Sequence, residues 1–276
     1  MSIWIWQSAE AQAGKSFLTC ALLPQPHGFF TSQFYPQMPA DLSSVLSPDA
    51  EVYRVKQVHS ADVLLPSEIE KAIASGLPQQ TDGSTASFPS ADGIVTERHS
   101  QLVWTCSADC TPALIADIET GQVSAVHAGW RGTAQKILPA AIARLRDQGS
   151  QLKNLRIALG PAIDGEVYQV GQEVAVEVGK SVVPHLEGTD LIAHLMELES
   201  PPLLSDSADG KVRLDVRRIN QMQLVQMGIE LECIAIAPHC TYQEPDRFFS
   251  YRRTREKKVQ WSGIVSGFDS AQPPRP

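Results

Sequence analysis

The chain has 276 residues, a length that suits one large domain or two small ones with a substantial hydrophobic core. Hydrophobic residues make up 43% of it and charged residues 20%, which excludes the composition of a disordered chain. The formal net charge of -8 argues against a nucleic-acid partner, because an acidic surface repels a phosphate backbone.

The amino-terminal segment lacks the basic and apolar regions of a secretory signal. No apolar run approaches about 18 residues, the length that a membrane span requires. Five cysteines are an odd number in a chain too large to need disulfides, which is typical of a reducing compartment. We therefore expect a cytoplasmic protein without a membrane partner.

Strand-like runs dominate the chain. Strands are predicted within residues 2–6, 51–65, 93–96, 102–106, 113–117, 122–128, 155–160 and 232–238, and helices over 133–146, 170–178 and 215–227. Thr133 and Asp215 fit N-cap positions, and Pro139 requires that its helix kink or begin later. Because strands follow one another without regular strand–helix alternation, the pattern predicts an α+β fold, a layered α/β/β/α sandwich with mixed sheets.

Two segments bear on domain organisation. Residues 188–210 combine prolines with a polar run and are interpreted as a surface excursion rather than a domain boundary. Residues 267–276 are rich in proline and polar residues and are expected to fray. We therefore predict a single catalytic domain over 1–266 and a flexible tail over 267–276.

Three side chains that bind metals well follow strand-like runs, namely His59, Cys110 and His127. Two imidazoles and one thiolate suit Zn²⁺ and leave a fourth tetrahedral position open, as catalytic zinc sites require. The separations along the chain are 51 and 17 residues, so no local finger-like spacing supports the set. The spacing alone leaves open that the histidines are structural and the cysteine a buried apolar residue.

The string HAGWRG, from His127 to Gly132, points to an anion site. Its glycines permit close backbone approach, Trp130 offers a flat face, and Arg131 offers a planar fork of donors that matches phosphate or carboxylate. A helix beginning near Thr133 would add a favourable anion environment. A glycine-rich turn with a solvated arginine is the alternative.

Two aspartates lie close to these residues in sequence. Asp109 precedes Cys110, and a carboxylate there could orient a histidine or carry a proton. Asp92 could do the same, but its place before Gly93 favours a turn-forming role.

Two later segments offer further candidates. The string FFSYRRT, residues 248–254, combines three aromatics with Arg252 and Arg253, as a purine or sugar pocket with an anion clamp would need. A strand edge with solvated arginines fits that composition equally well. His239 and Cys240 form a second, weaker metal candidate.

Several motifs, taken together, carry a resemblance that covers about Val52 to Arg253. They are QVH, ADGIVT, SADCTP, HAGWRG, LGPAI with YQVG, CT followed by FFSYRR, and Asp215, Asn220, Gln223 and Leu224 in a D-x4-N-x2-QL segment. This set resembles the laccase-domain, or polyphenol-oxidase-like, family of zinc-containing purine nucleoside phosphorylases, which includes peptidoglycan-editing-factor-like bacterial members.

The resemblance implies that His59, Cys110 and His127 are the zinc ligands. From the residues themselves, we predict that these three and Arg131 are catalytic and that Asp109, Tyr251, Arg252 and Arg253 bind the substrate. The implied reactions are phosphorolysis of adenosine, guanosine, inosine and 5'-methylthioadenosine and deamination of adenosine, so the partners are purine nucleosides and phosphate. Copper oxidation of phenols, which the family name suggests, is disfavoured because one cysteine and two histidines cannot hold four copper ions.

Two other functions remain open from the sequence. Cys110 could be a nucleophile and His127 its base in a metal-free hydrolase or deamidase that acts on a cell-wall precursor. Alternatively, the chain could be an interaction protein with a closed, four-ligand structural zinc. The first alternative predicts activity that survives a chelator, and the second predicts no activity.

Overall fold

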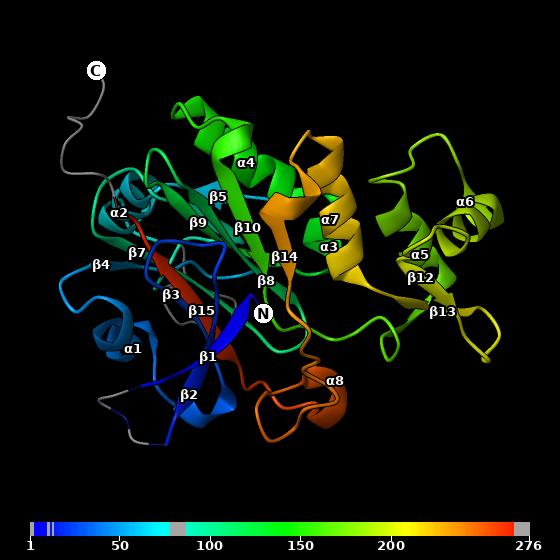
Figure 1. Cartoon of the computed structure of the whole chain (residues 1–276), viewed down its shortest axis with the longest axis horizontal. Helices are drawn as coiled ribbons and strands as arrows, with labels where there is room; N and C mark the ends of the chain where they lie inside the picture. The colour runs from blue at the N-terminus through cyan, green and yellow to red at the C-terminus, as the bar shows by residue number, and fades with distance from the viewer. Residues whose placement is uncertain (1–2, 10–11, 13, 78–86, 268–276) are drawn as a thin grey trace.

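Two six-stranded mixed sheets form the centre of the structure, a computed structural model that describes residues 3–9, 12, 14–77 and 87–267 (Figure 1). In order across the first sheet, the strands are β1 (Trp4–Ser8), β2 (Ser16–Cys20), β3 (His27–Phe30), β15 (Gln260–Val265), β7 (Gln101–Ser107) and β4 (Glu51–Tyr53). In order across the second, they are β14 (Ile234–Ile236), β10 (Leu155–Leu159), β8 (Thr111–Asp117), β9 (Val123–Ala128), β6 (Gly93–Val95) and β5 (Val63–Leu64).

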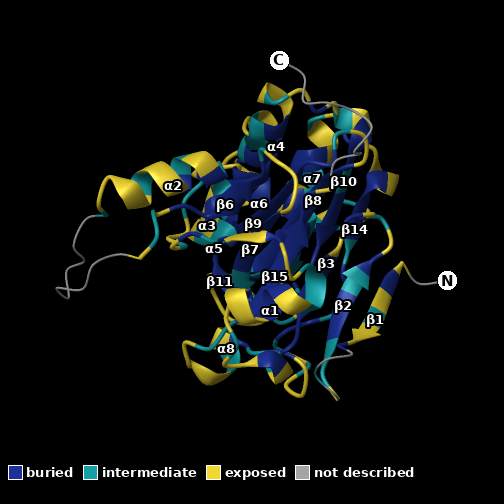
Figure 2. Cartoon of the chain, turned by 90° about the vertical axis from the view of Figure 1, so that its left-hand side faces the viewer, coloured by how far each residue is buried: buried dark blue, intermediate teal, exposed yellow. Residues whose placement is uncertain are grey.

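The sheets pack face to face and share one hydrophobic core. One cluster of buried side chains contains Leu18, Val103 and Ile264 of the first sheet together with Leu114 and Ala125 of the second. All seven residues of β8 are buried, which explains its continuous apolar sequence: a strand covered on both faces has no solvent side to make polar. Figure 2 shows these buried strands between helices that are exposed on their outer sides.

Helices cover the two outer faces. The helices are α1 (Pro39–Leu46), α2 (Pro66–Ala74), α3 (Trp130–Ala134), α4 (Ile137–Asp147), α5 (Gln172–Gly179), α6 (Gly188–Met196), α7 (Val216–Gln226) and α8 (Tyr251–Thr254), with short 3-10 turns at Ser32–Phe34, Leu152–Asn154 and Leu231–Cys233. Leu42 of α1 packs on the first sheet, and Leu138 of α4 and Leu224 of α7 pack on the second. The predicted α/β/β/α sandwich with mixed sheets is confirmed.

A smaller group of elements lies beside the sandwich, at the right of Figure 1. The strands β11 (Gln169–Gly171), β13 (Lys211–Leu214) and β12 (Leu203–Ser205) form a third sheet that packs with α5 and α6 around its own apolar cluster. The interpretation of residues 188–210 as a surface excursion is wrong, because they contain α6 and β12 with Leu191, Leu195 and Leu203 fully buried. The flanking prolines and the polar run hid this short amphipathic helix.

The helix predicted over 133–146 begins later than its proposed cap. Thr133 lies inside α3, and Lys136, at φ 63°, separates α3 from α4. Pro139 is the third residue of α4, where an amide hydrogen has no partner within the helix in any case. The helix predicted over 170–178 begins at Gln172, since Val170 belongs to β11.

The prediction for α7 is confirmed. Asp215 is its N-cap, and the carboxylate accepts hydrogen bonds from the backbone amides of Arg217 at 2.9 Å and Arg218 at 3.3 Å.

Two predictions concern the carboxy-terminal tail and the membrane. Of the tail predicted over 267–276, residues 268–276 lie outside the described residues, so the division into a catalytic domain and a flexible tail stays a prediction. Among the helices of the described part, none is long and apolar enough to cross a bilayer.

Candidate metal centre and active site

The structure brings His59, Cys110 and His127 together from three separate segments. The predicted strand over 51–65 is interrupted, and His59 lies in the intervening loop with a left-handed φ of 63°. Cys110 lies between β7 and β8, at the crossing from one sheet to the other, and His127 lies near the end of β9. Their candidate ligand atoms all lie within 4.8 Å of one another, with Cys110 Sγ 4.0 Å from His59 Nε2.

One buried carboxylate holds two of these three groups. Asp92 Oδ1 is 2.8 Å from His127 Nδ1, which leaves Nε2 as the ring nitrogen for a metal. Asp92 Oδ2 accepts hydrogen bonds from the backbone amides of Val58 at 3.0 Å and Ser60 at 2.7 Å, the two neighbours of His59. Asp92 therefore orients one histidine directly and the loop of the other, a role that its place before a glycine did not favour in the sequence.

Two glycines of HAGWRG allow this close packing. A Cβ atom at Gly129 would lie 2.9 Å from Cys110 Sγ and 3.2 Å from His59 Cδ2, so any side chain there would displace the cluster. A Cβ atom at Gly132 would lie 3.0 Å from the carbonyl oxygen of Ser60. These short distances explain why the motif has glycine at both positions: a larger residue would clash with the cluster or the His59 loop.

The electrostatics of the cluster favour a thiolate. Burial alone would raise the pKa of Cys110, but His127 and His59 stabilise the thiolate and lower this pKa to about 6. Burial alone would lower the pKa of His127, but the thiolate and Asp92 raise it to about 9. Two imidazoles, a thiolate and a carboxylate that orients one ring form a donor set that fits a divalent transition metal.

Tyr168, which the sequence patterns did not indicate, interacts electrostatically with Cys110 of the cluster and with Asp109, Arg131 and Arg252. Burial, together with the charges of Cys110 and Asp109, raises the pKa of Tyr168 to about 12, although the charges of Arg252 and Arg131 act in the opposite direction. These four groups therefore lie within electrostatic range of the phenol. Tyr168 lies in the YQVG string, where a single tyrosine between loop residues carries no signal of its own.

The two arginines that act on the pKa of Tyr168 differ in how they are held. The Arg131 guanidinium is exposed and lies over the Trp130 ring, 4.2 Å from its centroid. Arg252 lies 4.8 Å above the Tyr168 ring and donates to the carbonyl oxygen of Gln169 at 2.8 Å. Both guanidiniums keep further donors for an anion.

The other predicted substrate residues have mostly structural contacts. Arg253 donates to the carbonyl oxygens of Thr241, Tyr242 and Phe248, at 2.6 to 2.7 Å. Asp109 accepts from Thr241 Oγ1 at 2.8 Å and from the Arg252 amide at 2.7 Å. Asp109 therefore joins the Cys110 turn to α8, and Arg253 joins α8 to the segment 241–248.

Tyr251, at the start of α8, is 45% exposed. Its ring is therefore available at the surface next to Arg252.

The second metal candidate has little support. His239 Nδ1 contacts both carboxylate oxygens of Glu244 at 3.0 Å, and its ring packs against Trp6. Cys240 is buried and its sulfur accepts from the Asp164 amide. Within the described residues, the only group of three or more metal-binding side chains is His59, Cys110 and His127.

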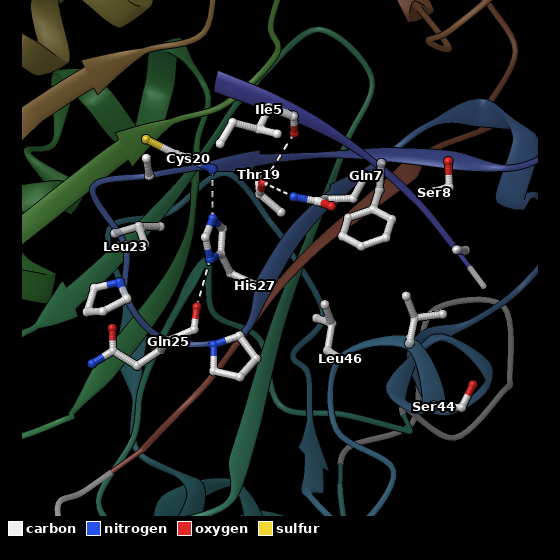
Figure 3. Close-up of a pocket in the computed structure, with 16 residues that line it drawn as sticks. Ile5, Gln7, Ser8, Thr19, Cys20, Leu23, Gln25, His27, Ser44 and Leu46 are labelled. Carbon is white, nitrogen blue, oxygen red and sulfur yellow. Dashed lines mark hydrogen bonds between the residues drawn. The ribbon is translucent and has the colours of Figure 1, made fainter. Parts of the chain in front are cut away.

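A hollow of about 630 Å³ lies elsewhere, between β1, β2 and α1 (Figure 3). It contains His27, whose two ring nitrogens are both used: Nε2 accepts from the Cys20 amide at 2.8 Å, and Nδ1 lies 2.7 Å from the Gln25 carbonyl oxygen. His27 therefore has no free ring nitrogen to bind a ligand in this hollow. The candidate site is the one identified by the metal-binding side chains His59, Cys110 and His127.

Comparison with known proteins identifies the family of the chain. Residues 40–266 match the family described as multi-copper polyphenol oxidoreductase laccase. The chain belongs to this family. A protein of Synechocystis sp. named purine nucleoside phosphorylase slr1573 is 49% identical over 272 residues, which cover 96% of this chain and 97% of that protein. The chain is accordingly an enzyme.

A second relative carries a different activity name. Adenosine deaminase RL5, from an unknown prokaryotic organism, is 30% identical over 79% of this chain and 72% of that protein. The crystal structure of YlmD from Geobacillus stearothermophilus has the same fold, with a TM-score of 0.69 and 24% identity, and the match covers 96% of this chain and 99% of that one.

Proposed function

We propose that this chain is a zinc-dependent purine nucleoside phosphorylase, acting on adenosine, guanosine, inosine and 5'-methylthioadenosine, with adenosine deaminase activity. The observation that carries the proposal is the convergence of His59, Cys110 and His127, with Arg131, Arg252 and Cys110 all within electrostatic range of Tyr168. The names of its relatives, which include both a phosphorylase and a deaminase, support the same activities.

The donor set supports zinc over other metals. A thiolate and two imidazoles favour Zn²⁺ over hard cations such as Mg²⁺. The chain has seven histidines in all, and the described cluster uses two of them, which is too few for the four copper ions of a multicopper oxidase. When bound, zinc would supply a Lewis acid that polarises an oxygen of phosphate or water.

The protein's own residues would prepare the reactants. Asp92 holds the His127 ring and the His59 loop in place, so the ligands need little rearrangement. Arg131 and Arg252 would balance the charge of phosphate, and the rings of Trp130 and Tyr168 offer faces for the nucleoside. Tyr251 would line the entrance. Asp109 would support this wall by holding α8 against the Cys110 turn, and Arg253 by holding α8 against the segment 241–248.

The decisive experiment is metal analysis combined with a nucleoside panel. We expect one zinc per chain and phosphate-dependent release of free base from inosine, guanosine, adenosine and 5'-methylthioadenosine. Adenosine should also yield inosine without phosphate. Stoichiometric copper with phenol oxidation at enzyme-like rates would refute the proposal, as would zinc-loaded protein that is inactive on the whole panel.

A second function is supported by one observation, the chain of contacts from Asp92 through His127 to the Cys110 thiolate. This arrangement also suits a cysteine nucleophile in a hydrolase or deamidase that acts on a cell-wall precursor. A chelator separates the two functions. Activity that is lost on zinc removal and restored by zinc supports the phosphorylase, whereas activity that survives zinc removal supports the cysteine hydrolase.

A further inference from the structure

Helix α3 carries Arg131 but is too short to hold its own conformation. It has five residues, and Lys136, in the left-handed region, separates it from α4. Helices of this length are unstable in isolation, because a single turn does not recover the cost of nucleation. The position of Arg131 therefore depends on what α3 packs against.

One side of α3 faces the metal candidates and the smaller group of elements. Gly132 lies against the carbonyl oxygen of Ser60, next to His59. Trp130 and Ala134 pack on the apolar cluster around the third sheet. These contacts limit how closely α3 approaches the His59 loop, but apolar packing does not by itself fix the rotation of so short a helix.

The other side of α3 is bound to α7 through polar groups. Thr133 is fully buried, and its Oγ1 donates to Asn220 Oδ1 at 3.2 Å. Gln223 Nε2 donates to the Thr133 carbonyl oxygen at 2.8 Å and to Ser181 Oγ at 2.7 Å. Asn220 and Gln223 are three residues apart, so they share one face of α7.

Asn220 and Gln223 are buried between α7 and α3, where apolar side chains would be buried at a lower cost in free energy. Asn220 is 0% exposed and Gln223 is 3% exposed. Among the described residues, neither Asn220 Nδ2 nor Gln223 Oε1 has a hydrogen-bond partner. Burying polar atoms in this way is unfavourable, so the benefit of the pair must come from the directional bonds that it makes to Thr133.

We propose that Asn220 and Gln223 are positioning residues that clasp Thr133, set the orientation of α3 and so place Arg131 beside the metal candidates. This gives the asparagine and glutamine of the D-x4-N-x2-QL segment a role in the reaction. The inference rests on the proposed function, because it assigns Arg131 to the phosphate.

The test uses Asn220→Leu and Gln223→Leu, which remove the bonds to α3 while keeping side-chain volume. Thr133→Val is a milder variant that removes only the contact to Asn220. Each should keep its zinc and stay folded at the assay temperature, with a lower melting temperature because a buried polar group loses its partner. KM for phosphate should rise by roughly tenfold, below the roughly hundredfold loss expected for removing Arg131 itself. Deamination should change less than phosphorolysis.

Gln226→Leu is the matched control. Gln226 also lies on α7 and donates to a backbone carbonyl oxygen, that of Val182 at 2.9 Å, but it does not contact α3. Its loss should leave KM for phosphate unchanged.

A double variant tests whether the clasp acts through Arg131. In an Arg131→Ala background, Asn220→Leu should cause no further loss of phosphorolysis. Losses that multiply in the double variant would overturn the inference, as would an activity loss that only follows a falling melting temperature.

Amide hydrogen exchange provides a readout that does not depend on activity. Exchange in residues 130–134 should rise in Asn220→Leu and Gln223→Leu and stay unchanged in Gln226→Leu. Unchanged exchange in the first two variants would refute the claim that Asn220 and Gln223 hold α3 in place through Thr133. An inactive wild-type protein would overturn the proposed function, while exchange would still decide the structural claim.

Discussion

Two buried histidines of this protein each lie beside a cysteine, yet their surroundings give them opposite properties. At His27, both ring nitrogens are bound to the backbone, by the Cys20 amide and the Gln25 carbonyl oxygen (Figure 3). Burial lowers the pKa of His27 and raises that of Cys20, so both side chains stay neutral. This pair holds a turn together.

At the candidate metal centre, the same two residue types become charged. Asp92 binds one ring nitrogen of His127 and leaves the other facing Cys110, whose pKa falls to about 6. The comparison shows that burial alone does not separate a reactive histidine from a structural one. At His127 the Cys110 side chain and the Asp92 carboxylate interact with the ring and raise its pKa, whereas both ring nitrogens of His27 are bound to the backbone.

The largest predicted effect comes from exchanging the two cysteines for alanine. Cys110→Ala should abolish phosphorolysis and deamination and lose zinc, because a ligand is removed, while the fold remains largely intact. Cys20→Ala should keep zinc and activity, at a cost of about 1 kcal/mol in the free energy of unfolding. Metal content, activity and thermal melting on both variants decide the matter, and full activity in a folded Cys110→Ala protein would break the comparison.

The two thiols should also differ in reactivity with pH. In metal-free protein, the alkylation rate of Cys110 should level off above pH 7 and fall about tenfold per unit well below pH 6, because only the thiolate reacts. Cys20 should resist alkylation at neutral pH, since burial raises its pKa and blocks access. Mass spectrometry of iodoacetamide-treated protein measures both; equal labelling of the two residues would contradict this account.

Arg131→Ala should retain zinc and lower phosphorolysis by about 10² or more, the loss typical of removing one charge-stabilising donor. Deamination, which uses water instead of phosphate, should fall less. Both activities need to be measured on the same zinc-loaded variant. Equal losses would mean that Arg131 binds the nucleoside or holds the site together, and no loss would mean that it is a solvated surface residue.

Asp92→Asn should weaken zinc binding by about 10- to 100-fold, as changes to the partners of metal ligands commonly do. The amide cannot accept hydrogen bonds on both sides, so either the His127 ring or the His59 loop loses its partner. Asp117→Asn is the control, because Asp117 is also buried and accepts from two backbone amides, those of Glu119 and Thr120. Similar zinc affinities in the two variants, measured by competition with a chelator, would refute the role of Asp92.

The smallest effect is expected at the structural histidine. His27→Leu leaves the Cys20 amide and the Gln25 carbonyl oxygen unpaired, which should lower the free energy of unfolding by about 1–3 kcal/mol. Zinc content and kcat should not change. A loss of zinc in a folded His27→Leu protein would show that the two histidines are less different than the structure indicates.

Local patterns in the sequence were enough for the layers and for α7. The apolar run within β8 and the Asp215 cap are properties of neighbouring residues, so they can be read before folding. Residue types likewise named His59, Cys110, His127 and Arg131 as candidates, helped by the specific HAGWRG motif.

Only the tertiary structure decided which residues, far apart in the chain, become hydrogen-bond partners. Asp92 looks like a turn residue until β6 and β9 pair and bring His127 to its carboxylate. Arg253 looks like an anion clamp until three carbonyl oxygens surround its guanidinium. A side chain's type sets which bonds it can make, but the partners that reach it first depend on long-range packing, which no local pattern records.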